Sequence, residues 1–228
     1  MLNVEFVRTG VPGLDEILGG GVIRGSSILL VGPAGTMKHR IGFQFLREGL
    51  LSGERAIYVS AIHTLTDVEF LMKINLEFDV DPYVKGGGRF AFVDAYDLLT
   101  SSLGNLSKLL KTFVVMVNNM LKAESSRSVI SLTPMLNIIT DDSAIARFSL
   151  LGTRFGRQRR STTLLILDEK AQNQQAETFL KSMCDYVLVT SHSDGATKIK
   201  VHKSPITCSQ EWHTLIVKPK GVKVIKPP

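Results

Sequence analysis

One segment of the sequence has the residue types and the spacing of a loop that binds phosphate. It consists of Gly32, Pro33, Ala34, Gly35, Thr36, Met37, Lys38 and His39, between an apolar run and a helical pattern. In such a loop, backbone N–H groups surround a phosphate at the N-terminus of a helix, and a Lys contacts the β- and γ-phosphates. Lys38 supplies this ammonium group. The segment therefore predicts a site for a phosphorylated ligand, and a plain Gly-rich turn is the alternative.

Two positions of this loop depart from the usual pattern. Met37 occupies the place of a second Gly, and His39 occupies the place of a Ser or Thr, whose hydroxyl would bind Mg²⁺. A Met side chain here would crowd the approach of a phosphate, and a His has no hydroxyl. We therefore expect that no cofactor is required, that ATP or ADP binds weakly at most, and that Mg²⁺ does not bind.

The elements that must position this loop alternate along the chain. Apolar runs predict strands at Ser27–Val31, Ala56–Ala61, Arg89–Asp94, Ser128–Leu132, Thr162–Leu167 and Tyr186–Thr190. Helical patterns occupy Ile41–Leu51, Leu65–Leu76, Leu103–Lys122, Asp141–Arg157 and Gln172–Met183. Continuous apolar strands that alternate with helices are typical of a mostly parallel sheet flanked by helices on both faces. The fold class is therefore α/β.

The C-terminal part of the chain has a different pattern. Three short strand-like runs follow one another without helices between them, at Lys198–His202, Thr214–Lys218 and Lys220–Ile225. They predict an antiparallel extension of the sheet. We expect a single domain over residues 1–228, with a core at about 7–203 and a C-terminal β extension at about 196–225.

Composition narrows the class of protein. The chain has 228 residues, of which 44% are hydrophobic, so general disorder is excluded. Cys184 and Cys208 are the only cysteines, which excludes a disulfide scaffold and a four-cysteine zinc site. The net charge of +6 is compatible with a polyanionic partner. Met1–Gly10 has no signal-peptide pattern and polar residues interrupt Leu98–Leu121, so we expect a cytoplasmic protein without a membrane partner.

Segments around the loop match a known pattern over nearly the whole chain, from about Val7 to Ile225. The matching segments are Thr9–Asp15, Leu18–Val22, Gln44–Leu46, Glu48–Leu50, Gly53–Glu54, Tyr58–Ser60, Val93–Ala95 and Gly221–Val224. They resemble the KaiC/RadA-like branch of the RecA superfamily of P-loop ATPases. The resemblance implies a RecA-like P-loop fold. Members of this family are ATP-driven motors and regulators, and they often form hexameric rings with nucleotide at the subunit interfaces. The resemblance therefore implies an activity of this kind.

The resemblance also locates the catalytic positions, and this chain has unsuitable residues there. The Mg²⁺-binding hydroxyl falls on His39, the catalytic glutamates on Ile62 and His63, the Walker B aspartate on Ser131, and a tail arginine on Pro205. None of these residues is a carboxylate that would polarise the attacking water or bind Mg²⁺. Phosphoryl transfer depends on positioning and charge stabilisation, so this pattern predicts a domain that does not hydrolyse ATP.

A second run of the sequence also looks like a Walker B strand. Leu164–Leu167 leads into Asp168 and Glu169, which would be the metal-binding carboxylate and the base. This is the fifth predicted strand, whereas the resemblance places Walker B on the fourth.

His39 and His63 would line the same pocket, but two imidazoles without a third ligand do not make a metal site.

Three functions follow from these observations. The first is a catalytically degenerate KaiC/RadA-like protein that acts as a binding, regulatory or assembly partner of itself, of an active relative or of another protein. The second is a weak ATPase or nucleotide-gated switch that uses Lys38 with Asp168 or Glu169. The third is a DNA-binding accessory protein of recombination, with Arg157, Arg159 and Arg160 as contacts to nucleic acid. The alternative for this basic run is the solvated end of a helix.

Overall fold

The computed structural model describes residues 4–100, 126–138, 156–171 and 174–225, together with residues 112, 115 and 154. The predicted helix at Leu103–Lys122 lies almost entirely outside the described residues. Of the predicted helix at Asp141–Arg157, the described part is its end, where residues 154 and 156–158 are helical. Among the described residues, no helix is long and apolar enough to cross a membrane.

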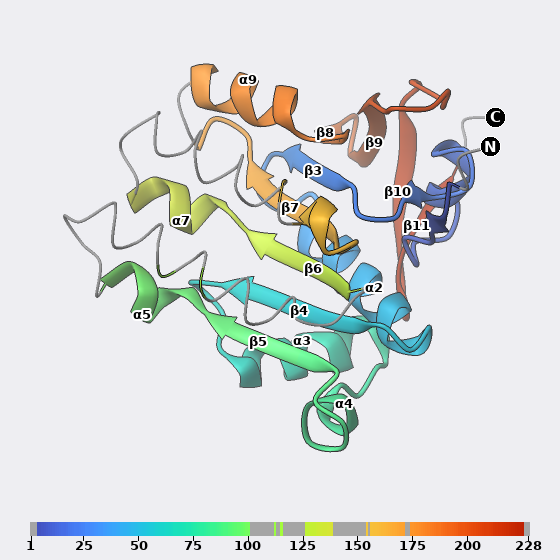
Figure 1. Cartoon of the computed structure of the whole chain (residues 1–228). Helices are drawn as coiled ribbons and strands as arrows, with labels where there is room; N and C mark the ends of the chain where they lie inside the picture. Colours follow the sequence, from blue (N-terminus) through green and yellow to red (C-terminus); the bar gives the residue numbers. More distant parts are fainter. Residues whose placement is uncertain are drawn as a thin grey trace.

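Strands and helices alternate as the sequence predicts (Figure 1). The strands are β1 Phe6–Val7, β2 Val22–Ile23, β3 Ser27–Gly32, β4 Arg55–Ser60, β5 Phe90–Asp94, β6 Ser126–Ser131, β7 Thr162–Asp168, β8 Tyr186–Ser193, β9 Ala196–Lys203, β10 His213–Lys218 and β11 Gly221–Ile225. The helices are α1 Leu14–Ile17, α2 Lys38–Leu51, α3 Leu65–Leu76, α4 Asp81–Lys85, α5 Ala95–Thr100, α7 Thr133–Ile138 and α9 Gln174–Met183.

Nine of the described strands form one large sheet with a parallel part and an antiparallel part, and β1 and β2 form a separate two-stranded sheet. The nine strands of the large sheet have the order β11-β10-β9-β8-β3-β7-β6-β4-β5. The pairs from β8 through β3, β7, β6 and β4 to β5 are parallel. The pairs β8–β9, β9–β10 and β10–β11 are antiparallel. The predicted α/β fold with a C-terminal antiparallel extension is therefore confirmed, while the assignment of the whole chain to a single domain stays a prediction.

Side chains on the two faces of this sheet belong to two different cores. Alternate residues of β3 show the division, since Ile28 and Leu30 belong to the larger core, which includes residues of α2 and α3. Leu29 and Val31 belong to the smaller core, which includes residues of α7 and α9. This alternation is what strands covered by helices on both faces require.

Short elements account for most of what the sequence pattern misses. The β1–β2 ribbon pairs Phe6 with Ile23 and Val7 with Val22, and such two-residue strands have no periodicity to recognise. Strand β8 runs three residues beyond its predicted end at Thr190. It continues into a hairpin with β9 through Asp194 and Gly195, both at positive φ. An Asp-Gly pair between two strands is a strong hairpin signal, so this turn was available in the sequence.

Candidate functional site

The predicted phosphate-binding loop connects β3 to α2 at the carboxyl end of the central strands. Gly35 and Met37 both have positive φ, 80° and 65°, and Met37 is the residue that precedes α2. The loop is closed by the Thr36 hydroxyl, which donates to Pro33 O at 2.7 Å and lies 2.7 Å from Thr190 Oγ1. The chain thus adopts a strand–loop–helix turn at the predicted place.

Met37 keeps the left-handed backbone that a Gly would normally adopt. For a residue with a Cβ this conformation costs about 1–2 kcal/mol. The side chain is partly buried and packs against the larger core. The crowding expected from this side chain is therefore reduced, because much of it contacts the core, and the strained backbone remains.

Lys38 is directed back onto the loop. It is 3% exposed. Its Nζ lies 2.9 Å from Asp168 Oδ1, donates to Gly32 O at 2.7 Å and also donates to Pro33 O. The Thr36 hydroxyl is a more distant neighbour at 3.4 Å. The ammonium group is therefore held by acceptors of its own chain.

Asp168 reaches Lys38 because of the order of the strands. Strand β7 lies directly beside β3, and Asp168 pairs with Gly32 in the parallel register. The backbone N–H of Asp168 donates to the Thr133 hydroxyl at 2.8 Å, and that of Glu169 donates to Gly32 O at 3.0 Å. Ser131 ends β6, one strand further from β3, and is buried. The carboxylate that contacts the loop is thus Asp168.

A cluster of neutral polar groups occupies the place where the resemblance puts the metal ligand and the base. Tyr58 Oη on β4 lies 3.2 Å from Nδ1 of His39 and 3.2 Å from Nδ1 of His63. The Ser60 hydroxyl is also 3.2 Å from His63 Nδ1, and it accepts the backbone N–H groups of Ile62 and His63. The two imidazole rings are 5.4 Å apart, edge to face. The sequence places both histidines here but gave no sign of the tyrosine between them.

Burial keeps both imidazoles uncharged near neutral pH. It lowers the pKa of His39 to about 4, with further lowering by His63 and Lys38, while Asp168 acts in the opposite direction. Burial also lowers the pKa of His63, against the attraction of Asp67. Burial raises the pKa of Tyr58, so its hydroxyl stays protonated. The cluster therefore supplies hydrogen bonds and no negative charge.

These residues do not fit a Mg²⁺ ion. Mg²⁺ prefers carboxylate and water oxygens in octahedral geometry, and His39, Ile62, His63 and Ser131 offer no carboxylate. Within the part of the chain that the structure describes, no group of three or more His, Cys, Asp or Glu side chains is placed to hold a metal ion. Asp168 is the carboxylate that pairs with Lys38, so its charge is already neutralised within the chain.

Lys203, two residues before Pro205, has a local structural role. Lys203 Nζ donates to the carbonyls of Lys181 and Ser182 at 3.2 and 2.7 Å, at the end of α9. A cation at this place satisfies carbonyl groups left free at a helix C-terminus. Pro205 is exposed and follows β9. Lys203 thus caps a helix of its own chain.

Two members of the basic run are engaged in ion pairs. Arg157 pairs with Asp185, and Arg160 pairs with Glu5 at 2.5 Å. Arg157, Arg159 and Arg160 are all exposed. Part of the positive charge predicted for nucleic acid is therefore balanced within the chain.

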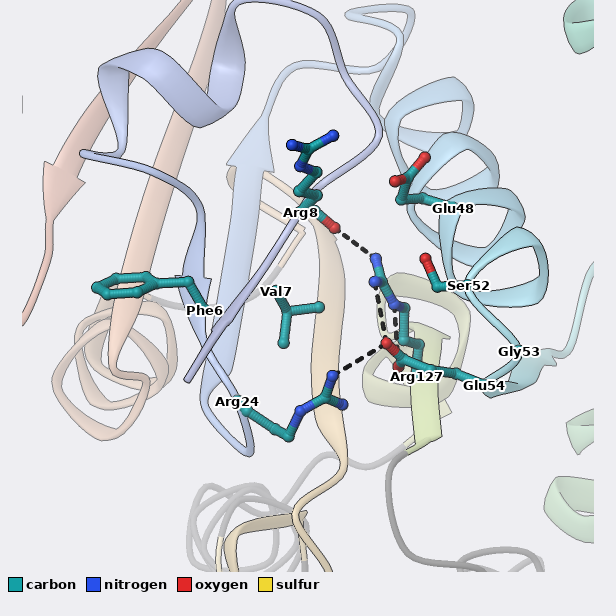
Figure 2. Close-up of a pocket in the computed structure, with 9 residues that line it drawn as sticks. All are labelled: Phe6, Val7, Arg8, Arg24, Glu48, Ser52, Gly53, Glu54 and Arg127. Carbon is teal, nitrogen blue, oxygen red and sulfur yellow. Dashed lines mark hydrogen bonds and ion pairs between the residues drawn. The ribbon is translucent and has the colours of Figure 1, made fainter. Parts of the chain in front are cut away.

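A separate hollow of about 440 Å³ lies at the opposite end of the parallel strands, where β4 and β6 begin (Figure 2). Arg127 and Glu54 form a buried ion pair there, and Arg24 bonds to the same carboxylate. Burial raises the pKa of Glu54, but the hydrogen bonds from Arg127 and Arg24 outweigh burial, so the pKa is lowered overall. This network has no recognisable pattern in the sequence beyond an Arg beside an apolar run.

Known proteins resemble this chain in sequence. The family model described as "ATPase: KaiC" matches residues 7–228. A UPF0273 protein of Thermotoga maritima is 41% identical over 96 residues, which are 41% of this chain and 38% of that protein. UPF0273 protein PH0284 of Pyrococcus horikoshii is 40% identical over 109 residues, which are 48% and 42% of the two chains. The matched stretch thus spans about two fifths of the length of these curated relatives.

A solved structure resembles this chain in fold. The crystal structure of the KaiC-like protein PH0186 from Pyrococcus horikoshii OT3 has a TM-score of 0.78. The match covers 98% of this chain and 100% of that chain, at 22% sequence identity. At this identity the likeness is one of fold, and it agrees with the α/β architecture described above.

Proposed function

The chain belongs to the KaiC family of P-loop ATPases, and we propose that it acts within this family as a binding and regulatory protein that does not hydrolyse ATP. One observation carries this function: the hydrogen-bonded cluster of His39, Tyr58 and His63 stands where a metal ligand and a catalytic carboxylate are expected. The lowered pKa values of both histidines leave the cluster without charge at neutral pH. Such a cluster offers no carboxylate to bind Mg²⁺ or to act as the general base.

The size of the expected loss supports a binding role. Each tenfold loss of rate corresponds to about 1.4 kcal/mol of barrier. A general base contributes typically about 10²–10⁴-fold, and the charge neutralisation given by metal ions is a further large part of phosphoryl transfer. Both contributions are missing from the cluster. We therefore expect the wild-type rate of ATP hydrolysis to be indistinguishable from that of Lys38→Ala, in which the loop lacks its ammonium group.

The scaffold around the loop supports a role in binding. The strand–loop–helix turn and Lys38 remain, so a phosphorylated ligand still has a place to bind. The partner we propose is a protein, either a second copy of this chain, an active relative or an unrelated protein. ATP or ADP would serve as a weakly bound effector rather than as a fuel.

A second function is favoured by a different observation. Asp168 Oδ1 lies 2.9 Å from Lys38 Nζ, and Glu169 follows it at the end of β7. In this alternative, a weak ATPase or nucleotide-gated switch uses Lys38 with Asp168 or Glu169. The DNA-binding alternative is less well supported, because Arg157 and Arg160 already form ion pairs within the chain.

Measurement of ATP turnover in Mg²⁺ separates these functions. We expect the wild-type chain to release phosphate no faster than Lys38→Ala prepared in the same way, since a contaminating ATPase would act equally in both samples. Turnover that is present in the wild type and lost in both Lys38→Ala and Asp168→Asn would replace the first function by the second.

A further inference from the structure

We propose that Asp168 is an internal counter-ion that competes with phosphate for Lys38, so that the loop takes up a di- or triphosphate chain only when this ion pair opens. This role rests on the binding part of the proposed function, namely that the loop still holds a phosphorylated ligand. It requires neither catalysis nor a metal ion. Asp168 then controls access to the loop instead of taking part in chemistry.

The hydrogen-bonding capacity of Lys38 is already used in full. An ammonium group has three N–H donors. Asp168 Oδ1, Gly32 O and Pro33 O all lie within hydrogen-bond distance of Nζ, the first at 2.9 Å and the second at 2.7 Å. Lys38 is also 3% exposed. A phosphate oxygen therefore receives a bond from this ammonium only after one of the three acceptors is displaced.

Asp168 is the acceptor that is able to leave. Gly32 O and Pro33 O are backbone groups of the loop, so their displacement would disrupt the loop itself. The Asp168 side chain is 37% exposed, and its rotation into water leaves its backbone unchanged. That backbone is fixed by the pairing with Gly32 and by the bond to the Thr133 hydroxyl. The ion pair is thus an element with two states beside a rigid loop.

The Asp168 carboxylate also removes the attraction that a polyanion needs. Lys38 and Asp168 together carry no net charge at the mouth of the loop. His39, in the first turn of α2, is neutral near pH 7 because burial lowers its pKa to about 4. Glu169 follows Asp168 and adds a further negative charge. Without a metal ion, phosphates at this place would face carboxylates, and removal of the Asp168 charge should strengthen their binding.

Calorimetric titration of tripolyphosphate and of ATP in EDTA tests this role. We expect Asp168→Asn to bind both ligands at least tenfold more tightly than the wild type, and Asp168→Ser to show the same direction. Glu169→Gln is the matched control, because it removes the same charge from the neighbouring residue and leaves the partner of Lys38 in place. Its gain in affinity should be clearly smaller than that of Asp168→Asn, because it relieves repulsion of the phosphates but leaves Lys38 paired with Asp168.

Three results would overturn the competition between Asp168 and phosphate. They are weaker or unchanged binding in both Asp168 variants, an equal gain in Glu169→Gln, and no detectable binding in any of the four proteins. Thermal melting of each variant verifies that it is folded. Turnover in Mg²⁺ would contradict the proposed function alone, because the titrations in EDTA do not depend on hydrolysis.

Discussion

The buried network at the amino end of β4 and β6 gives a prediction whose size follows from its contacts. Arg127 is 2% exposed, and its guanidinium donates to Glu54 at 3.1 and 3.2 Å. It also donates to Arg8 O (Figure 2). It donates to Phe45 O at 3.3 Å as well, and it lies over the Phe45 ring. Replacement by Met would keep much of the volume and remove every one of these bonds.

The cost of this replacement comes from the carboxylate left behind. Glu54 is 8% exposed, and in Arg127→Met it would keep Arg24 as its hydrogen-bonding partner. Breaking a buried ion pair by removal of one partner costs about 3–5 kcal/mol. We therefore expect the free energy of unfolding, measured by urea at pH 7, to fall by about 4 kcal/mol. That is a large part of a typical total of about 5–15 kcal/mol.

A double-mutant cycle tests whether the cost belongs to the pair. Glu54→Leu combined with Arg127→Met removes both charges, so the double variant should be more stable than the sum of the two single losses by at least about 2 kcal/mol. Lys85→Met breaks an exposed ion pair with Asp81 and is the control that should change little. A loss below about 1 kcal/mol in Arg127→Met, or simple additivity in the double variant, would refute this reasoning.

Three further predictions concern other parts of the chain. Burial lowers the pKa of His39 from 6.5 to about 4, so the unfolded chain binds more protons between these values and stability falls as pH drops through this window. Between pH 7.5 and pH 5, the free energy of unfolding measured in urea should therefore fall by about 2 kcal/mol less in His39→Asn than in the wild type. Equal losses in the two proteins would contradict this. Met37→Gly should change the free energy of unfolding by less than about 1 kcal/mol, because relief of the left-handed strain offsets lost packing and Gly entropy. Met37→Ala loses the same packing but keeps the strained Cβ, so urea unfolding should show it to be less stable than Met37→Gly, and equal stability would count against the role of the backbone. Gln44 forms hydrogen bonds with Gly10 O and with both backbone groups of Val222. Gln44→Leu should therefore lower the free energy of unfolding by about 3 kcal/mol and speed hydrogen exchange at Val222. Unchanged exchange at Val222 would show that other contacts hold the β11 edge.

The order of elements could be predicted from the sequence because most strands are apolar on both faces. Runs such as Ser27–Val31 and Thr162–Leu167 match β3 and β7 within one residue, since burial between two helical layers leaves few polar positions. The β1–β2 ribbon could not be predicted, because two residues per strand carry no period. Residues 8–21 separate its strands, so no short turn motif marks their pairing.

The site could be predicted by position but not by contact. The loop and His39 and His63 lie where the sequence places them. The sequence does not show that Tyr58 bridges the two histidines, or that Asp168 holds Lys38. Both contacts join residues from different strands and helices, so they depend on side-chain directions that no local pattern encodes. The charge network of Arg127 and Glu54 was missed for the same reason.

We propose that this member of the KaiC family keeps a phosphate-binding loop but has lost the use of Mg²⁺. Isothermal titration of ATP into the wild-type chain, once in Mg²⁺ and once in EDTA, tests this proposal. We predict weak binding with the same affinity in both solutions, because His39, His63 and Ser131 offer no carboxylate to the metal. Binding at least tenfold tighter in Mg²⁺ would contradict the claim.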